Sequence, residues 1–278
     1  LCMNRPRALV DRNTLIGTLL VAFLGWLVFG QLLFQSIQWA SYNWLFVLRK
    51  PVTISDACIV FLDEESHAEL KQPGNAPWDR RLHARLIDRL AAAGARAIVF
   101  DIVFLDSGRG VTEAEMALAA AAKKAGNVIV GANPRPSRQK VAEPDVDLPF
   151  DALREAVDDR WGLVGMDPDV DQVIRRHMDC YPPFKPSMSW VAASFLKAPI
   201  TQARDDAELE RRQKQLRWIN YYGRGKSFAN CSYAAALDPA RVPDSLFRGR
   251  VVFVGASTLT KFSNERKDAY VKIGRAHV

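Results

Sequence analysis

The sequence predicts an α/β fold: a layered domain with a mostly parallel sheet flanked by helices, preceded by one N-terminal transmembrane helix. Two apolar runs, Ile54–Asp63 and Ala97–Leu105, have the length and the β-branched and aromatic content of strands buried on both faces. A stretch with helical spacing of its apolar residues lies between them. Because strand, helix and strand in this order form a parallel crossover, we expect both strands in one sheet.

The helix between these strands has an end signal on each side. Asp79 precedes it and is typical of a helix N-cap, and Gly94 follows it and suits a C-terminal cap. Its apolar residues share one face: Leu82, Leu86, Ile87 and Leu90. This face is predicted to pack on the sheet.

The alternation of strands and helices continues along the chain. Thr112 begins an alanine-rich helix, Glu113–Ala125, which ends at Gly126 and leads into a third apolar strand, Asn127–Gly131. The polar, proline-rich segment 134–147 is predicted to be a loop. Further strands are predicted at Gly162–Met166, Val173–Arg176, Leu216–Tyr221 and Val251–Gly255, and further helices at Leu153–Val157, Ser189–Leu196, Thr201–Gln215 and Ser232–Leu237. This alternation favours an α/β layered domain.

The N-terminal region has the pattern of a membrane anchor. Residues 1–13 are basic, and residues 14–34 are uncharged and apolar. As a helix at about 1.5 Å per residue, the segment 14–34 reaches roughly 31 Å, close to the thickness of a bilayer core. A cleaved signal peptide has a shorter apolar core, of about 7–15 residues, so an uncleaved transmembrane helix is favoured. Because basic residues precede the span, we expect a cytoplasmic N-terminus at the plasma (inner) membrane.

The composition is mildly basic. The chain has 38 Lys and Arg against 31 Asp and Glu, a formal net charge of +7, without a dense basic block. This distribution does not support nucleic-acid binding and agrees with a location close to a membrane. The four cysteines form no CxxC pair, so no zinc site is predicted, and a disulfide between Cys180 and Cys231 is left open.

Carboxylates end or interrupt two of the apolar runs. The segment 63–66 (Asp-Glu-Glu-Ser) ends the first strand, Asp101 lies within the second, and Asp106 follows the second. Ligands of open parallel sheets bind beyond the C-terminal ends of the strands, so these groups are candidates for holding a small polar ligand or a divalent cation. The structural alternative is that Asp63 caps the following turn and that Asp101 pairs with Arg80 or Arg81. We expect Asp101 to lie beside the strand that ends at Asp63.

Signals for catalysis or metal binding are weak. A phosphohydrolase would place its nucleophile at Asp63 and a second acid two residues later, where Glu65 stands, but its remaining site residues are not evident. The acidic segment Asp167–Asp171 resembles the start of a calcium loop without the central glycine and final glutamate, so a turn is favoured. No HExxH or other metal-ligand spacing occurs. We predict no catalytic residue, no metal site and no cofactor.

Six motifs, in order along the chain, resemble those of one sensory family. They are Ile59–Ser66, Pro77–Ala84, Gly94–Phe104, Asp169–Arg176, Ile219–Gly223 and Phe253–Ser257. On these motifs the chain resembles the CHASE domain of type two, a sensory module found outside the cytoplasm in bacterial receptors. The sequence departs from the family pattern at Gln172, where a glycine is usual in the acidic turn.

The resemblance implies that residues 35–271 form an extracytoplasmic sensor domain of a homodimeric transmembrane receptor for an unidentified small-molecule or periplasmic signal. An output domain, such as a nucleotide cyclase, a diguanylate cyclase, a histidine kinase or a Ser/Thr kinase, is then expected beyond this chain. Residues 273–278 resemble one frame of a common sequencing adapter, and that frame also allows Lys272, so we expect the true protein sequence to stop at Val271 and the chain to be truncated there. The candidate ligand-binding residues are Asp63, Glu64, Ser66, Trp78, Arg80, Asp101 and Asn220.

Two rival functions accompany the sensor hypothesis. One is a membrane-anchored, metal-dependent phosphohydrolase that uses Asp63. The other is a structural module that aids dimerisation and binds no ligand. Turnover of a phosphoester favours the first, and dimerisation with no detectable ligand favours the second.

Overall fold

The computed structural model describes residues 11–29, 32–50, 52–73, 76–106, 108, 110–134, 146–166, 168–171, 173–181, 185–222 and 227–257. The described residues divide into two units, one ending at Lys50 and one beginning at Val52. Residues 1–10 of the predicted cytoplasmic N-terminus and residues 272–278 lie outside the described residues.

The first unit contains the helices α1 (Arg12–Phe29) and α2 (Leu32–Leu48). The predicted transmembrane helix covers residues 14–34, of which residues 30 and 31 lie outside the described residues; α1 ends at Phe29 and α2 begins at Leu32. Among the described residues, no helix combines the length and the apolar character that crossing a membrane requires.

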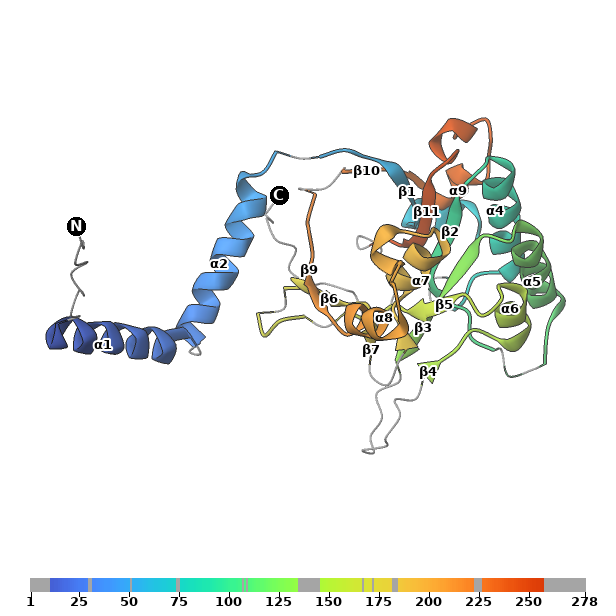
Figure 1. Ribbon diagram of the computed structural model, residues 1–278. Helices are drawn as coiled ribbons and strands as arrows, with labels where there is room; N and C mark the ends of the chain where they lie inside the picture. The colour runs from blue at the N-terminus through green and yellow to red at the C-terminus, as the bar shows by residue number, and fades with distance from the viewer. Residues whose placement is uncertain are drawn as a thin grey trace, which may run out of the picture. The chain divides into compact units, whose positions relative to one another are not determined.

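The second unit is an α/β domain, as predicted (Figure 1). Its strands are β1 (Ile54–Leu62), β2 (Ala97–Val103), β3 (Val128–Pro134), β4 (Val146–Asp147), β5 (Trp161–Leu163), β6 (Arg176–Met178), β7 (Cys180–Tyr181), β8 (Lys185–Pro186), β9 (Leu216–Trp218), β10 (Phe228–Ser232) and β11 (Val251–Ala256). Its helices are α3 (Glu64–Glu69), α4 (Arg80–Ala92), α5 (Glu113–Ala125), α6 (Asp151–Ala156), α7 (Met188–Phe195), α8 (Asp206–Gln213) and α9 (Tyr233–Ala236), with 3-10 turns at Pro199–Thr201 and Asp244–Leu246.

One seven-stranded sheet organises this unit. Its order is β10-β1-β11-β2-β3-β4, and β5 also pairs with β3. Every pair is parallel except β3 with β4. Because β11 lies between β1 and β2, the expectation that Asp101 lies beside the first strand is wrong. Gly255 of β11 separates the two strands and is in register with Phe61 on one side and Asp101 on the other.

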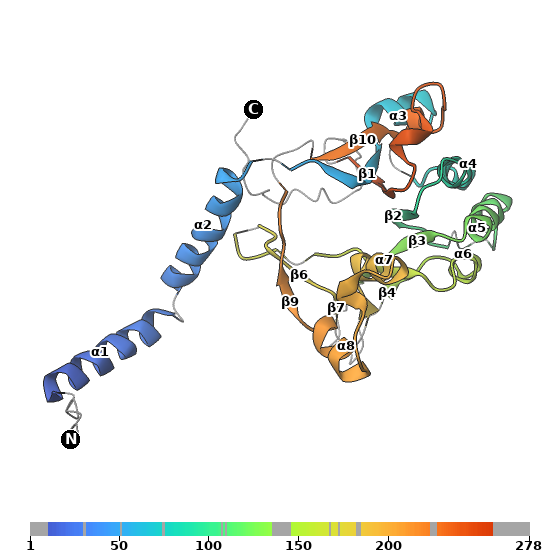
Figure 2. The same ribbon diagram turned by 45° about the horizontal axis from the view of Figure 1, so that its top comes forward.

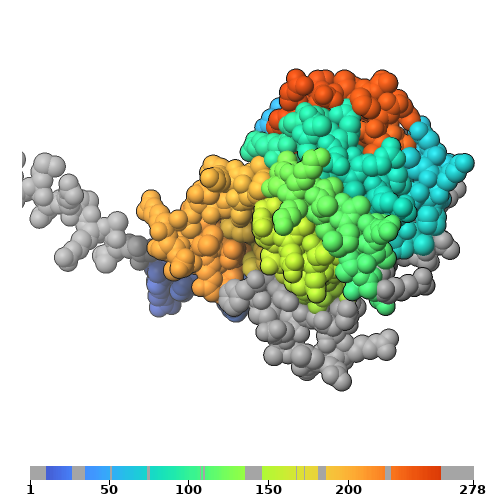
Figure 3. All heavy atoms as spheres, turned by 90° about the vertical axis from the view of Figure 1, so that its right-hand side faces the viewer, coloured from blue at the N-terminus to red at the C-terminus, as the bar shows by residue number. Residues whose placement is uncertain are grey.

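The sheet is covered on both faces, so its central strands are buried as their apolar sequences predict. The helices α4, α5 and α6 cover one face, and α7 covers the other (Figure 2). α4, α5 and α6 also lie side by side on the surface of the molecule (Figure 3). In β2, Ile98 and Phe100 face the first layer, and Ala97 and Val99 face α7.

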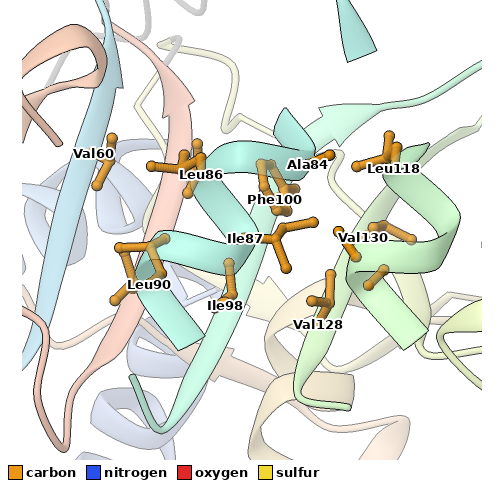
Figure 4. Packing of buried hydrophobic residues seen from close by; sticks show 14 of the residues in the cluster. Val60, Ala84, Leu86, Ile87, Leu90, Ile98, Phe100, Leu118, Val128 and Val130 are labelled. Atoms are coloured by element: carbon orange, nitrogen blue, oxygen red, sulfur yellow. The ribbon is translucent and has the colours of Figure 1, made fainter. Parts of the chain in front are cut away.

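The larger core lies beneath α4 and α5. Figure 4 shows side chains of α4 packed against β2, between β1 and the pair formed by α5 and β3. The fully buried residues labelled there are Val60, Leu86, Ile87, Leu90, Ile98, Phe100, Leu118, Val128 and Val130. Burying an aliphatic or aromatic side chain of this size contributes about 1.5–3 kcal/mol, so this layer dominates the stability of the domain.

The two long helices begin where the sequence predicts. The Asp79 carboxylate accepts the N–H of Arg81 at 3.0 Å and caps α4. The Thr112 hydroxyl accepts the N–H of Glu115, and the Glu115 carboxylate accepts the N–H of Thr112, forming a capping box at the start of α5. Gly126 ends α5 with a φ of 71°, in the left-handed region that glycine adopts readily.

Two predicted strands do not join the main sheet. The segments near Val173–Arg176 and Leu216–Tyr221 contribute β6 and β9, which pair with each other in a separate antiparallel sheet. The strand β10 at the edge of the main sheet was not predicted. Cys180 and Cys231 are not joined to each other, so the disulfide left open by the sequence is not formed.

Candidate functional site

Three of the candidate residues lie at the end of β1 and start α3. The Asp63 carboxylate accepts the N–H of Ser66 at 2.9 Å, so Asp63 is the N-cap of α3, the structural alternative predicted for it. Ser66 is fully buried, and its hydroxyl accepts the N–H of Ala234 in α9 at 2.9 Å. Glu64 is exposed in the first turn of α3. Asp63 and Ser66 therefore organise the junction of β1, α3 and α9.

Asp101 is exposed on β2 and lies against Gly255. A Cβ atom at Gly255 would lie 3.2 Å from the Cβ of Asp101, so the absence of a side chain at this position makes room for the aspartate. The predicted ion pair of Asp101 with Arg80 or Arg81 is wrong. Arg81 pairs with Asp79, its Nε lying 3.1 Å from Oδ1, and Arg80 instead donates to the carbonyl of Leu105.

The acidic turn that precedes β6 is a structural ion-pair network. The Arg175 side chain is 1% exposed, and its Nη1 donates to Oδ2 of Asp169 at 3.0 Å. Its Nη2 donates to Oδ2 of Asp171 at 2.7 Å, and Arg176 adds a second bond to Asp169. Bidentate pairing of this kind satisfies a buried guanidinium, so the turn is held by its own charges. Asn220 lies beyond this small sheet, exposed after β9.

A cavity of about 430 Å³ lies at the carboxyl end of β2. Its walls come from the loop before α4, the first residue of α4, the end of β2 and the first turn of α5. The lining side chains used below are Trp78, Arg80, Leu105, Asp106, Thr112 and Glu115. The edge at the carboxyl ends of the strands is therefore a candidate site, as the sequence predicts, but the cavity lies at β2 and not at β1.

Trp78 and Arg80 are the two predicted residues that line this cavity. Trp78 is 7% exposed and packs edge-on against Tyr233, with ring centroids 5.4 Å apart. The Arg80 guanidinium lies over the Phe104 ring, 4.9 Å from its centroid. Burial lowers the pKa of Arg80, and the Glu115 carboxylate opposes that shift. Arg80 is thus a half-buried cation held by an aromatic face.

The sequence analysis placed Asp106 among the carboxylates at this edge but did not identify Thr112 and Glu115 as site residues. Glu115 is 3% exposed and lines the cavity, although it also belongs to the capping box of α5. The spacing of Thr112 and Glu115 is the capping-box pattern, and its position after the Asp101 strand is the signal that would have pointed to this edge.

A metal site is not seen in the part of the chain that the structure describes. No group of three or more His, Cys, Asp and Glu side chains there is placed to hold a metal ion. The cavity itself combines one cation, carboxylates and apolar walls at the carboxyl end of a parallel strand. These are the features of a small-molecule site in an α/β domain.

Comparison with protein families identifies the family of the chain. The model of the CHASE2 domain matches residues 18–269. Since this match covers most of the sequence, the chain belongs to the CHASE2 domain family, a family of extracellular sensory domains. No curated protein and no solved structure matches the chain.

Proposed function

We propose that this chain is the signal-input part of a bacterial transmembrane receptor whose output domain lies beyond it. The family match over residues 18–269 carries this proposal. The cavity at the end of β2 supports it, because its volume falls within the range of about 300–1,000 Å³ typical of small-molecule sites. The ligand would bind between Trp78, Arg80 and Glu115.

The cavity offers a physical route from ligand to signal. Its walls belong to α4, β2 and α5, and a molecule that contacts all three favours the arrangement in which they fit it. A ligand shifts a receptor only through its different affinities for the two states. We therefore expect that a ligand which contacts both helices shifts the receptor between its two states. We expect the receptor to act as a homodimer.

The N-terminal helix α1 supports attachment to the plasma (inner) membrane. Its large apolar side chains are exposed on all sides, among them Leu19 at 62%, Val21 at 69% and Trp26 at 73%. Apolar surface of this extent requires a cover such as lipid. Because Arg5 and Arg7 precede α1 and Arg12 is its first residue, we expect the N-terminus in the cytoplasm and the α/β unit outside it.

A binding screen tests the sensor function. The purified chain is melted in the presence of a library of small metabolites, and the same samples are assayed for hydrolysis of phosphoesters. The expected result is a raised melting temperature with at least one compound and no turnover. Binding that is lost in Trp78→Ala, but retained in a variant of an exposed tryptophan such as Trp218→Ala, would place the ligand in the cavity.

Two outcomes contradict the proposal. Hydrolysis that disappears in Asp63→Asn would favour the phosphohydrolase. A blank screen from a chain that sediments as a dimer would favour the structural module. Membrane attachment is tested separately: the chain should fractionate with membranes, and protease added outside the inner membrane should digest the α/β unit.

A further inference from the structure

The cavity at the carboxyl end of β2 is lined by charged side chains of both signs, and some of them can still form hydrogen bonds to a ligand. Arg80 is its cation, and Asp79, Asp106 and Glu115 are its carboxylates. Asp79 is already paired with Arg81. The charges that remain for a ligand are therefore those of Arg80, Asp106 and Glu115.

Arg80 has most of its hydrogen-bonding capacity to spare. A guanidinium carries five N–H donors. One of them, on Nη2, reaches the Leu105 carbonyl at 3.4 Å, and among the described residues Arg80 forms no ion pair. Its forked donors match a carboxylate, which accepts two parallel bonds.

Glu115 is the acceptor on the opposite side, and one of its two carboxylate oxygens is still available. Its Oε2 accepts both the N–H of Thr112, at 2.8 Å, and the Thr112 hydroxyl, at 3.0 Å. Within the described residues no donor reaches its second oxygen, Oε1, although the side chain is 3% exposed and lines the cavity. Oε1 is not among the fully buried atoms that lack a partner, so it keeps contact with the solvent of the cavity, where an ammonium group can bond to it.

Neither charge alone suits this cavity. A simple anion would meet Arg80 but also the like charges of Asp106 and Glu115. Arg80 and Glu115 already attract each other across the cavity, so a simple cation would compete with Arg80 for that carboxylate. A molecule with a carboxylate and an ammonium satisfies both sides, and the apolar wall of Trp78 and Leu105 accommodates an apolar substituent.

We propose that the cavity binds a small zwitterion, a free α-amino acid with an apolar side chain, through its carboxylate on Arg80 and its ammonium on Glu115. This inference rests on the proposed sensory function and names the ligand class of the same site. Asp106, at the exposed mouth, adds a second negative charge near the ammonium.

Binding of L-leucine to the full chain, measured by isothermal titration, tests the proposal. Two analogues each remove one charge: the methyl ester of leucine lacks the carboxylate, and N-acetyl-leucine lacks the ammonium. We expect L-leucine to bind and each analogue to bind at least about tenfold more weakly, because each analogue loses its charged hydrogen bond to one of the two residues.

Charge-removing variants locate the site. Arg80→Gln and Glu115→Gln should each weaken L-leucine binding at least about tenfold. The glutamine in Glu115→Gln can still complete the capping box, so α5 keeps its start, and melting without ligand checks this. The matched controls are Arg85→Gln on α4 and Glu113→Gln on α5, both exposed and outside the cavity, which should bind like the parent chain.

Three outcomes overturn the proposal that the cavity binds a zwitterion. They are no binding of L-leucine, equal binding of its methyl ester or its N-acetyl form, and unchanged binding by Arg80→Gln and Glu115→Gln. The broader sensor function has its own readout, because the metabolite screen covers other chemistries. A hit there from a purely anionic or neutral compound would leave the sensor function standing while this inference fails.

Discussion

His83 makes the stability of the α/β unit depend on pH. It lies on the buried face of α4, and its Nδ1 is 2.9 Å from the Tyr233 hydroxyl. The imidazole ring meets Phe100, Phe104 and Tyr233 edge-on, with centroids 5.9, 5.2 and 5.6 Å away. This aromatic surrounding excludes water, so the charged form of the ring is disfavoured.

The sign of the effect follows from the shifted pKa. Burial lowers the pKa of His83 from 6.5 to about 3; the Arg80 charge acts in the same direction, and the Asp79 charge opposes it. Between these values the unfolded chain holds a proton on His83 that the folded chain does not, so stability falls as the pH falls. A difference of one bound proton changes the free energy of unfolding by about 1.4 kcal/mol per pH unit. Lowering the pH from 6.5 to 5 should therefore lower the free energy of unfolding by about 2 kcal/mol.

Urea unfolding of the parent chain and of His83→Gln, followed between pH 7.5 and pH 5, measures this contribution. The variant should be less stable at pH 7.5, because it loses ring contacts, yet its unfolding free energy should fall less on acidification, by about 2 kcal/mol. Tyr233→Phe is the control, since it removes the hydrogen bond, at about 1–3 kcal/mol, but keeps the histidine and the steep pH dependence. Parallel pH profiles for the parent and His83→Gln would refute the reasoning.

Two further substitutions test contacts that hold the α/β unit together outside the cavity. In a urea titration, Gly162→Ala should lower the unfolding free energy by about 1–3 kcal/mol, because the new Cβ would lie 2.5 Å from the backbone N and Cα of Met188. The control, Gly165→Ala, should be tolerated, because its new Cβ would lie 3.5 Å from its nearest neighbour, Cγ of Pro134. Arg175→Met should cost about 3–5 kcal/mol by leaving the buried Asp169 with less of its countercharge. Adding Asp169→Asn should recover part of that loss; no recovery would contradict the ion-pair account.

The sequence alone determined the elements whose ends are marked by local chemistry. Asp79 caps α4, and Thr112 and Gly126 bound α5, because capping is a contact between residues a few positions apart. The continuous apolar runs likewise identified β1 and β2 as strands. β2 is buried on both faces, whereas β1 joins the larger core on one face and keeps Ile59 and Phe61 half-buried on the other. The order of motifs was enough to recognise the family.

Only the tertiary structure decided which distant segments meet. β11 enters between β1 and β2, and β6 pairs with β9, because strand pairing joins segments far apart in the chain and no local pattern encodes the choice. The same folding brings Arg80 from α4 and Glu115 from α5 to one cavity at the end of β2, while Asp63 is committed to capping α3. The sequence predicts a candidate site at the carboxyl edge of the sheet, and this stays a prediction. Which side chains share it depends on how the helices pack over the strands.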